Sequence, residues 1–157
     1  MKKIILTAAT VLLATLAAPV AAQATQPIEL KGNVQLDKIV IENGREKHVL
    51  VEPKVVVPGD KLIFATAYRN TGSTSVSNVV VTNPIPAGVA LAQGDAPLAD
   101  VSVDGGKTWG KLTQLTVTGP NGVKRAAQSS DVTHIRWILA QLAPGASGTV
   151  SYHGVVR

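Results

Sequence analysis

The 157-residue chain contains no cysteine and few aromatic residues: one phenylalanine, two tyrosines and two tryptophans. Without cysteine the protein cannot form a disulfide, and a lipid anchor on an N-terminal cysteine is excluded as well. A folded domain must therefore be held by its own core, and a chain of this size buries about two-thirds of its unfolded surface. So few aromatic rings also leave little material for an aromatic binding platform.

The charged residues are spread along the chain and form no basic cluster. Fifteen lysines and arginines oppose ten acidic residues, which gives a formal net charge of +5. A nucleic-acid-binding surface needs clustered basic residues with interleaved aromatics, so we expect solvated charges and no nucleic-acid partner. The excess of positive charge predicts at most a weak attraction to anionic envelope polymers.

The N-terminus predicts a helical secretory signal peptide over residues 1–24. Two lysines precede an apolar run over residues 4–18, and the small-residue segment APVAAQA follows. Cleavage after Ala22 or Ala24 leaves small residues at the positions that the peptidase reads. A membrane anchor is the alternative, but the run is short for a bilayer span and no second such run follows. We therefore expect an exported protein, periplasmic or at the cell surface, with no membrane span after cleavage and a net charge lowered from +5 to +3.

After the signal, the sequence predicts a flexible leader over residues 25–32 and one all-β domain over residues 33–157. The segment 57–88 reads VPGDKLIFATAYRNTGSTSVSNVVVTNPIPAG. Bulky residues alternate with small or charged ones over residues 62–69, which is the period of a strand. Residues 77–82 predict a second strand, apolar enough for both of its faces to be covered. The polar residues between them predict a hairpin.

Turn-forming residues lie between these two strands and after the second one, and they are expected to be structural. Asn70 and Gly72 shape the turn between the strands, because asparagine bonds to nearby backbone and glycine tolerates unusual φ. Proline cannot donate to a sheet ladder, so the run of Asn83, Pro84 and Pro86 is expected to end the second strand.

Short strands separated by turn signals continue along the rest of the chain. An Asn-Gly pair at residues 43–44 predicts a hairpin between strands over residues 34–41 and 48–51, with a bulge where the alternation slips at residues 36–39. Further strands are expected at residues 89–91, 101–103, 112–118, 133–139 and 149–156, with a polar loop at 119–131 and a short helical turn at 138–142. The core is expected to contain Phe64, Val79, Val81, Ile135 and Trp137. Many short strands without a helical period indicate an antiparallel β-sandwich.

Several motifs occur in a fixed order: PGD, YRNTGS and VVVTNPIPAGV within residues 58–89, SVDGGKTW at 102–109, and HIRWILAQLAPGASGTVSYHGVV at 134–156. In this order they resemble the conserved-repeat domain of bacterial and archaeal surface proteins, the family known as domain of unknown function eleven. The resemblance covers most of the chain after the signal. It implies an immunoglobulin-like β-sandwich of the cell envelope. That family's domains usually occur in tandem, whereas this chain carries one copy.

The segment 102–109 also fits the pattern S-x-D-x-G-x-T-W, which resembles the Asp-box of sialidase-like propellers. Asp104 is expected to accept hydrogen bonds from turn amides, while Gly105 and Gly106 supply unusual φ angles and Trp109 packs over the turn. A single copy cannot build a propeller, so the segment predicts a self-capping hairpin.

Residues for catalysis or metal binding do not form a recognisable constellation in the sequence. His48, His134 and His153 lie on three predicted strands; the last two face each other only if their strands pair, and neither has an acidic neighbour in sequence. No G-x-S-x-G elbow is present, which removes the usual signature of a serine hydrolase. We expect no catalytic residue, no metal and no cofactor.

The sequence therefore favours a non-enzymatic, exported β-sandwich that acts as a structural or protein-interaction element of the cell envelope. Its partner is expected to be an unidentified envelope protein or polysaccharide, and an open sheet edge is able to accept a partner strand. The alternative is a carbohydrate-binding module that recognises envelope polysaccharide through Trp109 with Asp95 and Asp100. A hydrolase is the third hypothesis.

Overall fold

The structure is a computed structural model that describes residues 27–95 and 99–157. Within these ranges the regular elements are antiparallel strands and two short 3₁₀ turns, so the expected all-β class is confirmed. No helix among the described residues has the length and apolar character needed to cross a bilayer. The expected signal peptide and its cleavage site lie outside the described residues.

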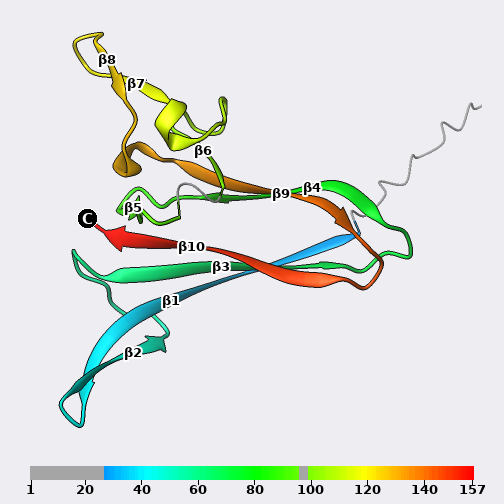
Figure 1. The fold of residues 1–157 in the computed structure, drawn as a ribbon, viewed down its shortest axis with the longest axis horizontal. Helices are drawn as coiled ribbons and strands as arrows, with labels where there is room; N and C mark the ends of the chain where they lie inside the picture. Colours follow the sequence, from blue (N-terminus) through cyan, green and yellow to red (C-terminus); the bar gives the residue numbers. More distant parts are fainter. Residues whose placement is uncertain (1–26, 96–98) are drawn as a thin grey trace, which may run out of the picture.

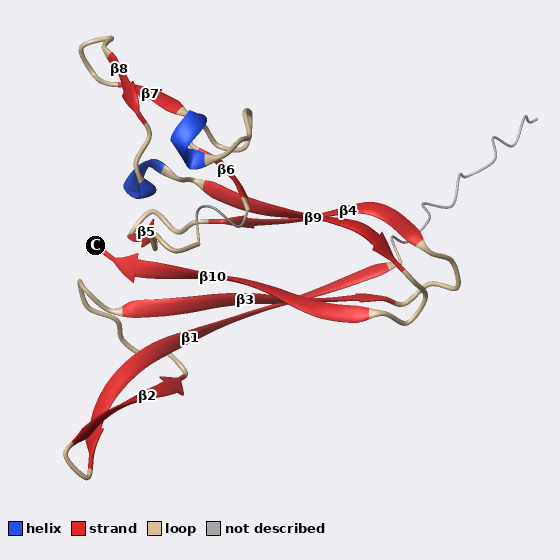
Figure 2. Cartoon of the chain, viewed as in Figure 1, coloured by secondary structure: helices blue, strands red, loops and turns tan. Residues whose placement is uncertain are grey.

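Two antiparallel sheets face each other across a common core (Figure 1). The larger sheet has the order β2-β1-β3-β10-β5, with bounds Arg45–Val51, Ile28–Glu42, Lys61–Asn70, Ser147–Val156 and Val89–Leu91. The smaller sheet has the order β4-β9-β6, with bounds Val76–Pro84, His134–Leu142 and Asp100–Ser102. A separate hairpin pairs β7 (Thr116–Thr118) with β8 (Lys124–Ala126), and the 3₁₀ turns are η1 (Leu112–Gln114) and η2 (Ser129–Asp131) (Figure 2).

The core is made by the inward members of the alternating strands. The larger sheet contributes Leu62 and Tyr152, and the smaller sheet contributes Val101 and Ile135, all of them buried. Phe64 stacks on Tyr152 with ring centroids 4.7 Å apart. Of the residues expected in the core, Val81 and Ile135 are fully buried and Phe64 and Trp137 pack against the main cluster, whereas Val79 is half-buried and lies outside it.

The expected hairpin over residues 62–82 is wrong, because its two strands belong to different sheets. β3 has β1 on one side and β10 on the other, so no edge of β3 remains for β4. The chain crosses after β3 to the opposite layer, where β4 pairs with β9. One face of β4 is open to solvent, with Val80 49% exposed, so the expectation that both faces are covered is wrong as well.

The N-terminal strand is longer than expected and needs no bulge. β1 begins at Ile28, and residues 28–32 pair with residues 66–70, so this part of the expected leader is strand. The register with β3 and then with β2 runs without interruption through residues 36–39. The alternation slips there because β1 passes beyond the end of the core, where Ile41 is 68% exposed. The Asn-Gly turn at residues 43–44 closes this outlying hairpin, with φ of 54° and 75°.

Two further expectations are corrected by long-range pairing. Residues 138–142 continue β9, because all of them except Ala140 pair with residues of β4, so no helical turn forms there. The expected loop over 119–131 contains β8 and η2, and the expected strand over 112–118 begins with η1. Arg125 and Asp131 form a bidentate ion pair of 2.6 and 2.7 Å that ties this hairpin to η2 and lowers the pKa of the Asp131 carboxyl.

Candidate functional site

The Asp-box turn is organised by one aspartate and one buried serine. Asp104 accepts hydrogen bonds from the Thr108 backbone N–H at 2.9 Å, from the Thr108 hydroxyl at 2.7 Å and from the Lys107 N–H at 3.1 Å. The hydroxyl of Ser102 donates to the same carboxylate at 2.7 Å. These donors, led by the Thr108 backbone and then its hydroxyl, hold the pKa of the Asp104 carboxyl well below its usual range.

The glycines and the tryptophan complete the turn. Gly105 and Gly106 have φ of 78° and 87°, a region that side chains disfavour. The indole N–H of Trp109 donates to the Gly106 carbonyl at 2.9 Å. A bridge between Val101 and Gly110 then closes the segment with backbone bonds of 2.9 and 3.1 Å. The turn is thus held by its own polar groups, and its carboxylate and indole N–H are both engaged in that task.

Above the outer face of the smaller sheet, four side chains form what we call the Trp109 cluster: Trp109, Arg136, Asp100 and Lys111. The Arg136 guanidinium carbon lies 4.5 Å from the centre of the Trp109 ring, a cation–π contact. Asp100 lies 3.6 Å from Arg136 and 3.3 Å from Lys111. Strand pairing brings this about, because Asp100 stands directly opposite Arg136 in the β6–β9 register.

The three residues expected to form a carbohydrate site are not brought together. Trp109 and Asp100 meet through Arg136, but Asp95 has different partners. Its carboxylate accepts the backbone N–H of His153 and lies 3.0 Å from Nδ1 of the same residue. Asp95 therefore fastens its loop to β10, in the other sheet from the Trp109 cluster.

The histidines do not converge on a common site. His134 lies on β9 and His153 on β10, which belong to different sheets, so they do not face each other across paired strands. His48 lies 2.8 Å from Asp37 on the outlying hairpin, and His153 contacts Asp95. Within residues 27–95 and 99–157 no group of three potential metal ligands occurs.

Asn70 ties the two sheets together, a role that the sequence reasoning did not foresee. Its side chain is 0% exposed. The amide donates to the carbonyls of Leu142 on β9 and Thr74 in the crossing segment, at 2.9 and 2.8 Å, and accepts the Gly72 N–H at 2.9 Å. Gly72 fits closely beside it, because an added Cβ would lie 2.6 Å from Pro27.

Two more polar contacts cross the interior between the sheets. Asn83 on β4 donates to the Thr66 hydroxyl on β3 at 2.8 Å. The buried Tyr152 hydroxyl on β10 donates to the Pro84 carbonyl on β4 at 3.0 Å, and burial raises the pKa of this phenol. Asn83 and Pro84 were expected to end a strand, yet both lie within β4, and Pro86 follows it. The roles of Thr66 and Tyr152 carry no local sequence signal, because their partners lie 17 and 68 positions away along the chain.

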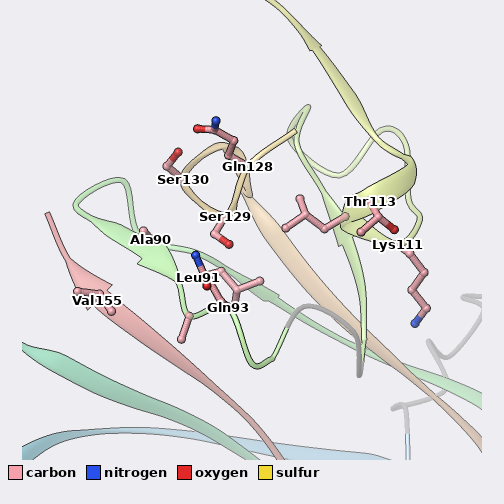
Figure 3. A pocket seen from close by; sticks show the side chains of 11 residues that line it. Ala90, Leu91, Gln93, Lys111, Thr113, Gln128, Ser129, Ser130 and Val155 are labelled. Carbon is pink, nitrogen blue, oxygen red and sulfur yellow. The ribbon is translucent and has the colours of Figure 1, made fainter. Parts of the chain in front are cut away.

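A cavity of about 850 Å³ opens at the end of the sandwich where β5 meets the 3₁₀ turns. Its lining side chains come from β5 and the residues after it, from η2, from the segment around η1 and from Val155 on β10 (Figure 3). Apolar groups such as Leu91 and Leu112 alternate with the neutral polar groups of Gln93, Ser129 and Ser130. Lys111 is the one titratable side chain in this lining, and its ammonium is bonded to the Ala99 carbonyl at 3.1 Å. Such a lining offers hydrogen bonds to a neutral ligand but no acid–base pair.

The geometry defines a two-layer antiparallel β-protein whose motif residues mainly hold its turns and layers. No known protein family, curated protein or solved structure matches this chain.

Proposed function

We propose that this protein is an exported, non-enzymatic module of the cell envelope, serving as a structural or protein-interaction element. The observation that carries the proposal is the use of the motif side chains. Asp104 makes its hydrogen bonds to backbone N–H groups and hydroxyls of its own turn. Asn70 makes three hydrogen bonds to backbone groups, one of them on the opposite sheet, and the Trp109 indole is bonded to its own turn. The motif side chains that could bind a ligand or take part in catalysis are thus engaged in holding the turns and the two sheets.

An immunoglobulin-like arrangement is part of this proposal. It is supported by two facing antiparallel sheets and by a chain that crosses between them after β3, β4, β5 and β9. The order of motifs along residues 58–156, which resembles the conserved-repeat domain of surface proteins, supports the same arrangement. The expected signal peptide supports export.

The proposal is tested by expressing the full chain with a C-terminal tag in a Gram-negative host. We expect the protein in the envelope fraction, with a new N-terminus at Gln23 or Thr25 by mass spectrometry. Purified protein should show no turnover on glycoside or ester substrates. An uncut protein retained in the cytoplasm would contradict export, and saturable hydrolysis that purifies with the protein would contradict the non-enzymatic assignment.

Carbohydrate binding is the second candidate, and the Trp109 cluster is the observation that favours it. An indole ring beside a guanidinium and a carboxylate offers stacking and charged hydrogen bonds to a sugar. Titrating peptidoglycan or polysaccharide fragments while following tryptophan fluorescence tests this candidate. A saturable change that Trp109→Ala abolishes supports it. Trp137 packs against the core, so its fluorescence in that variant serves as the internal control.

A further inference from the structure

The first part of β1 is an unpaired edge of the larger sheet. β1 pairs with β3 over residues 28–37, but β2 reaches it only from residue 36 onward. On its second side, residues 28–35 have no strand partner among the residues that the structure describes. Figure 1 shows β2 beside only the far end of β1.

The backbone bonds show which residues face the open edge. The Thr71 N–H donates to the Pro27 carbonyl at 2.7 Å, so the backbone carbonyl of Pro27 points toward the β3 side. Asn70, the partner of Ile28, instead bonds to Ala146 at 2.9 Å, so Ile28 points its own backbone groups away from β3. These directions alternate along an antiparallel strand, so Leu30 and Gly32 also present free N–H and C=O groups.

Apart from the charges of Glu29 and Lys31 on its outer face, this edge lacks the features that usually prevent strand addition. Charges pointing toward the core, a proline or a kink would block another strand. Ile28, Leu30 and Gly32 form the core-side face of this segment, with no charge among them, and Leu30 is 52% exposed. The β4 edge, in contrast, carries a positive φ of 54° at Asn78 and a proline at position 84. The edges of β5 and β6 are three residues long.

We propose that this edge pairs with the same edge of a second copy, in an antiparallel register centred on Leu30. Leu30 then faces Leu30 of the second copy, and Ile28 faces Gly32. The pairing forms about six backbone hydrogen bonds, two for each of three facing pairs. It joins the two larger sheets into one continuous sheet with twofold symmetry.

Charge complementarity selects both the partner and the register. With Leu30 at the centre, Glu29 of each copy lies opposite Lys31 of the other, on the outer face of the sheet. The neighbouring registers that keep the same backbone groups facing place Glu29 against Glu29 or Lys31 against Lys31. Opposite charges facing each other across strands are favourable and like charges are unfavourable. The sequence of this edge is therefore complementary to itself in one register.

This inference names a partner for the proposed interaction module but rests on β1 alone. Purified protein in solution tests it, whereas fractionation and enzyme assays test the envelope role. A failure of the dimer proposal and a failure of the proposed envelope function therefore appear in different measurements.

The first experiment uses the absence of cysteine from the chain. Leu30→Cys introduces a single thiol, and facing residues of a narrow antiparallel pair have Cα atoms about 5.5 Å apart, within disulfide range. Mild oxidation of the full-length expressed protein is expected to give a covalent dimer on a non-reducing gel. Ser77→Cys, at an exposed position on β4, is the matched control and should stay mostly monomeric. Equal crosslinking of both variants would overturn the proposal.

The second experiment reverses charges and measures self-association by sedimentation across a dilution series. Glu29→Lys and Lys31→Glu each place like charges opposite each other twice per dimer, so each should weaken association by about tenfold or more. Mixing these two variants restores opposite charges in a heterodimer and should recover association. Glu46→Lys, an exposed charge change on β2, should have no effect. A wild-type chain that stays monomeric at every concentration, or a mixture that gains nothing over the single variants, would overturn the proposal.

Discussion

Replacing Asn70 with alanine is expected to destabilise the fold more than any comparable change at an exposed asparagine. The amide is 0% exposed and bonds to two carbonyls and one N–H. Alanine removes all three hydrogen bonds and leaves three backbone groups without their partner. One of them, the Leu142 carbonyl, lies on the opposite sheet, so the variant also loses a connection between the layers.

The magnitude follows from the number of bonds. Each net hydrogen bond contributes about 1 kcal/mol, which gives a loss of about 3 kcal/mol in the free energy of unfolding. For a domain of this size the loss corresponds to a fall of about 10 °C in Tm. Asn70→Asp keeps the acceptor but points a carboxylate at two carbonyls, so at neutral pH it should destabilise at least as much.

Calorimetry and urea unfolding of the wild type, Asn70→Ala and Asn33→Ala measure this effect. Asn33 is exposed on β1, and its truncation should change stability by no more than about 0.5 kcal/mol. A Tm shift for Asn70→Ala as small as that of Asn33→Ala would refute the argument that this side chain holds the layers together.

Three further predictions concern the turn and the interior. Asp104→Asn should lower Tm at neutral pH. Because the folded-state pKa of Asp104 is depressed, the difference in Tm between wild type and variant should narrow as pH falls below about 4. Thermal melts of both proteins at a series of pH values measure this difference. Tyr152→Phe removes the bond to the Pro84 carbonyl and should cost about 1 kcal/mol in urea unfolding, a result that an unchanged midpoint would contradict. Gly154→Ala should destabilise by about 2 kcal/mol, because the new Cβ would lie 2.4 Å from a valine methyl on β5, whereas Gly88→Ala, with no heavy atom within 4 Å, should be nearly neutral in the same assay.

Some of the strands were predictable because they depend on local alternation. Residues 62–69 and 133–139 carry the period of two, and the structure has β3 and β9 there. The Asn-Gly pair at 43–44 likewise places both positive φ angles within one turn. These features depend on neighbours in sequence, so the chain displays them directly.

The assignment of strands to sheets could not be predicted, because it depends on distant partners. β3 and β4 are consecutive, yet β1 and β10 occupy both sides of β3 and force the chain across to the other layer. For the same reason Asn70 resembled a turn residue, although its most distant partner lies 72 positions away. The contact between Trp109 and Arg136 similarly arises from the pairing of β6 with β9, which no local pattern encodes.

The arrangement of the outer strands around β3 has a mechanical consequence. β1 and β10 both run antiparallel to β3, with ten and nine residue pairs, so Ile28 and Val156 lie at opposite ends of the larger sheet. A pulling force between these ends acts along the strands and loads both ladders in shear. The bonds are then expected to resist extension together instead of opening one after another, so the geometry favours a domain that carries tension along its length.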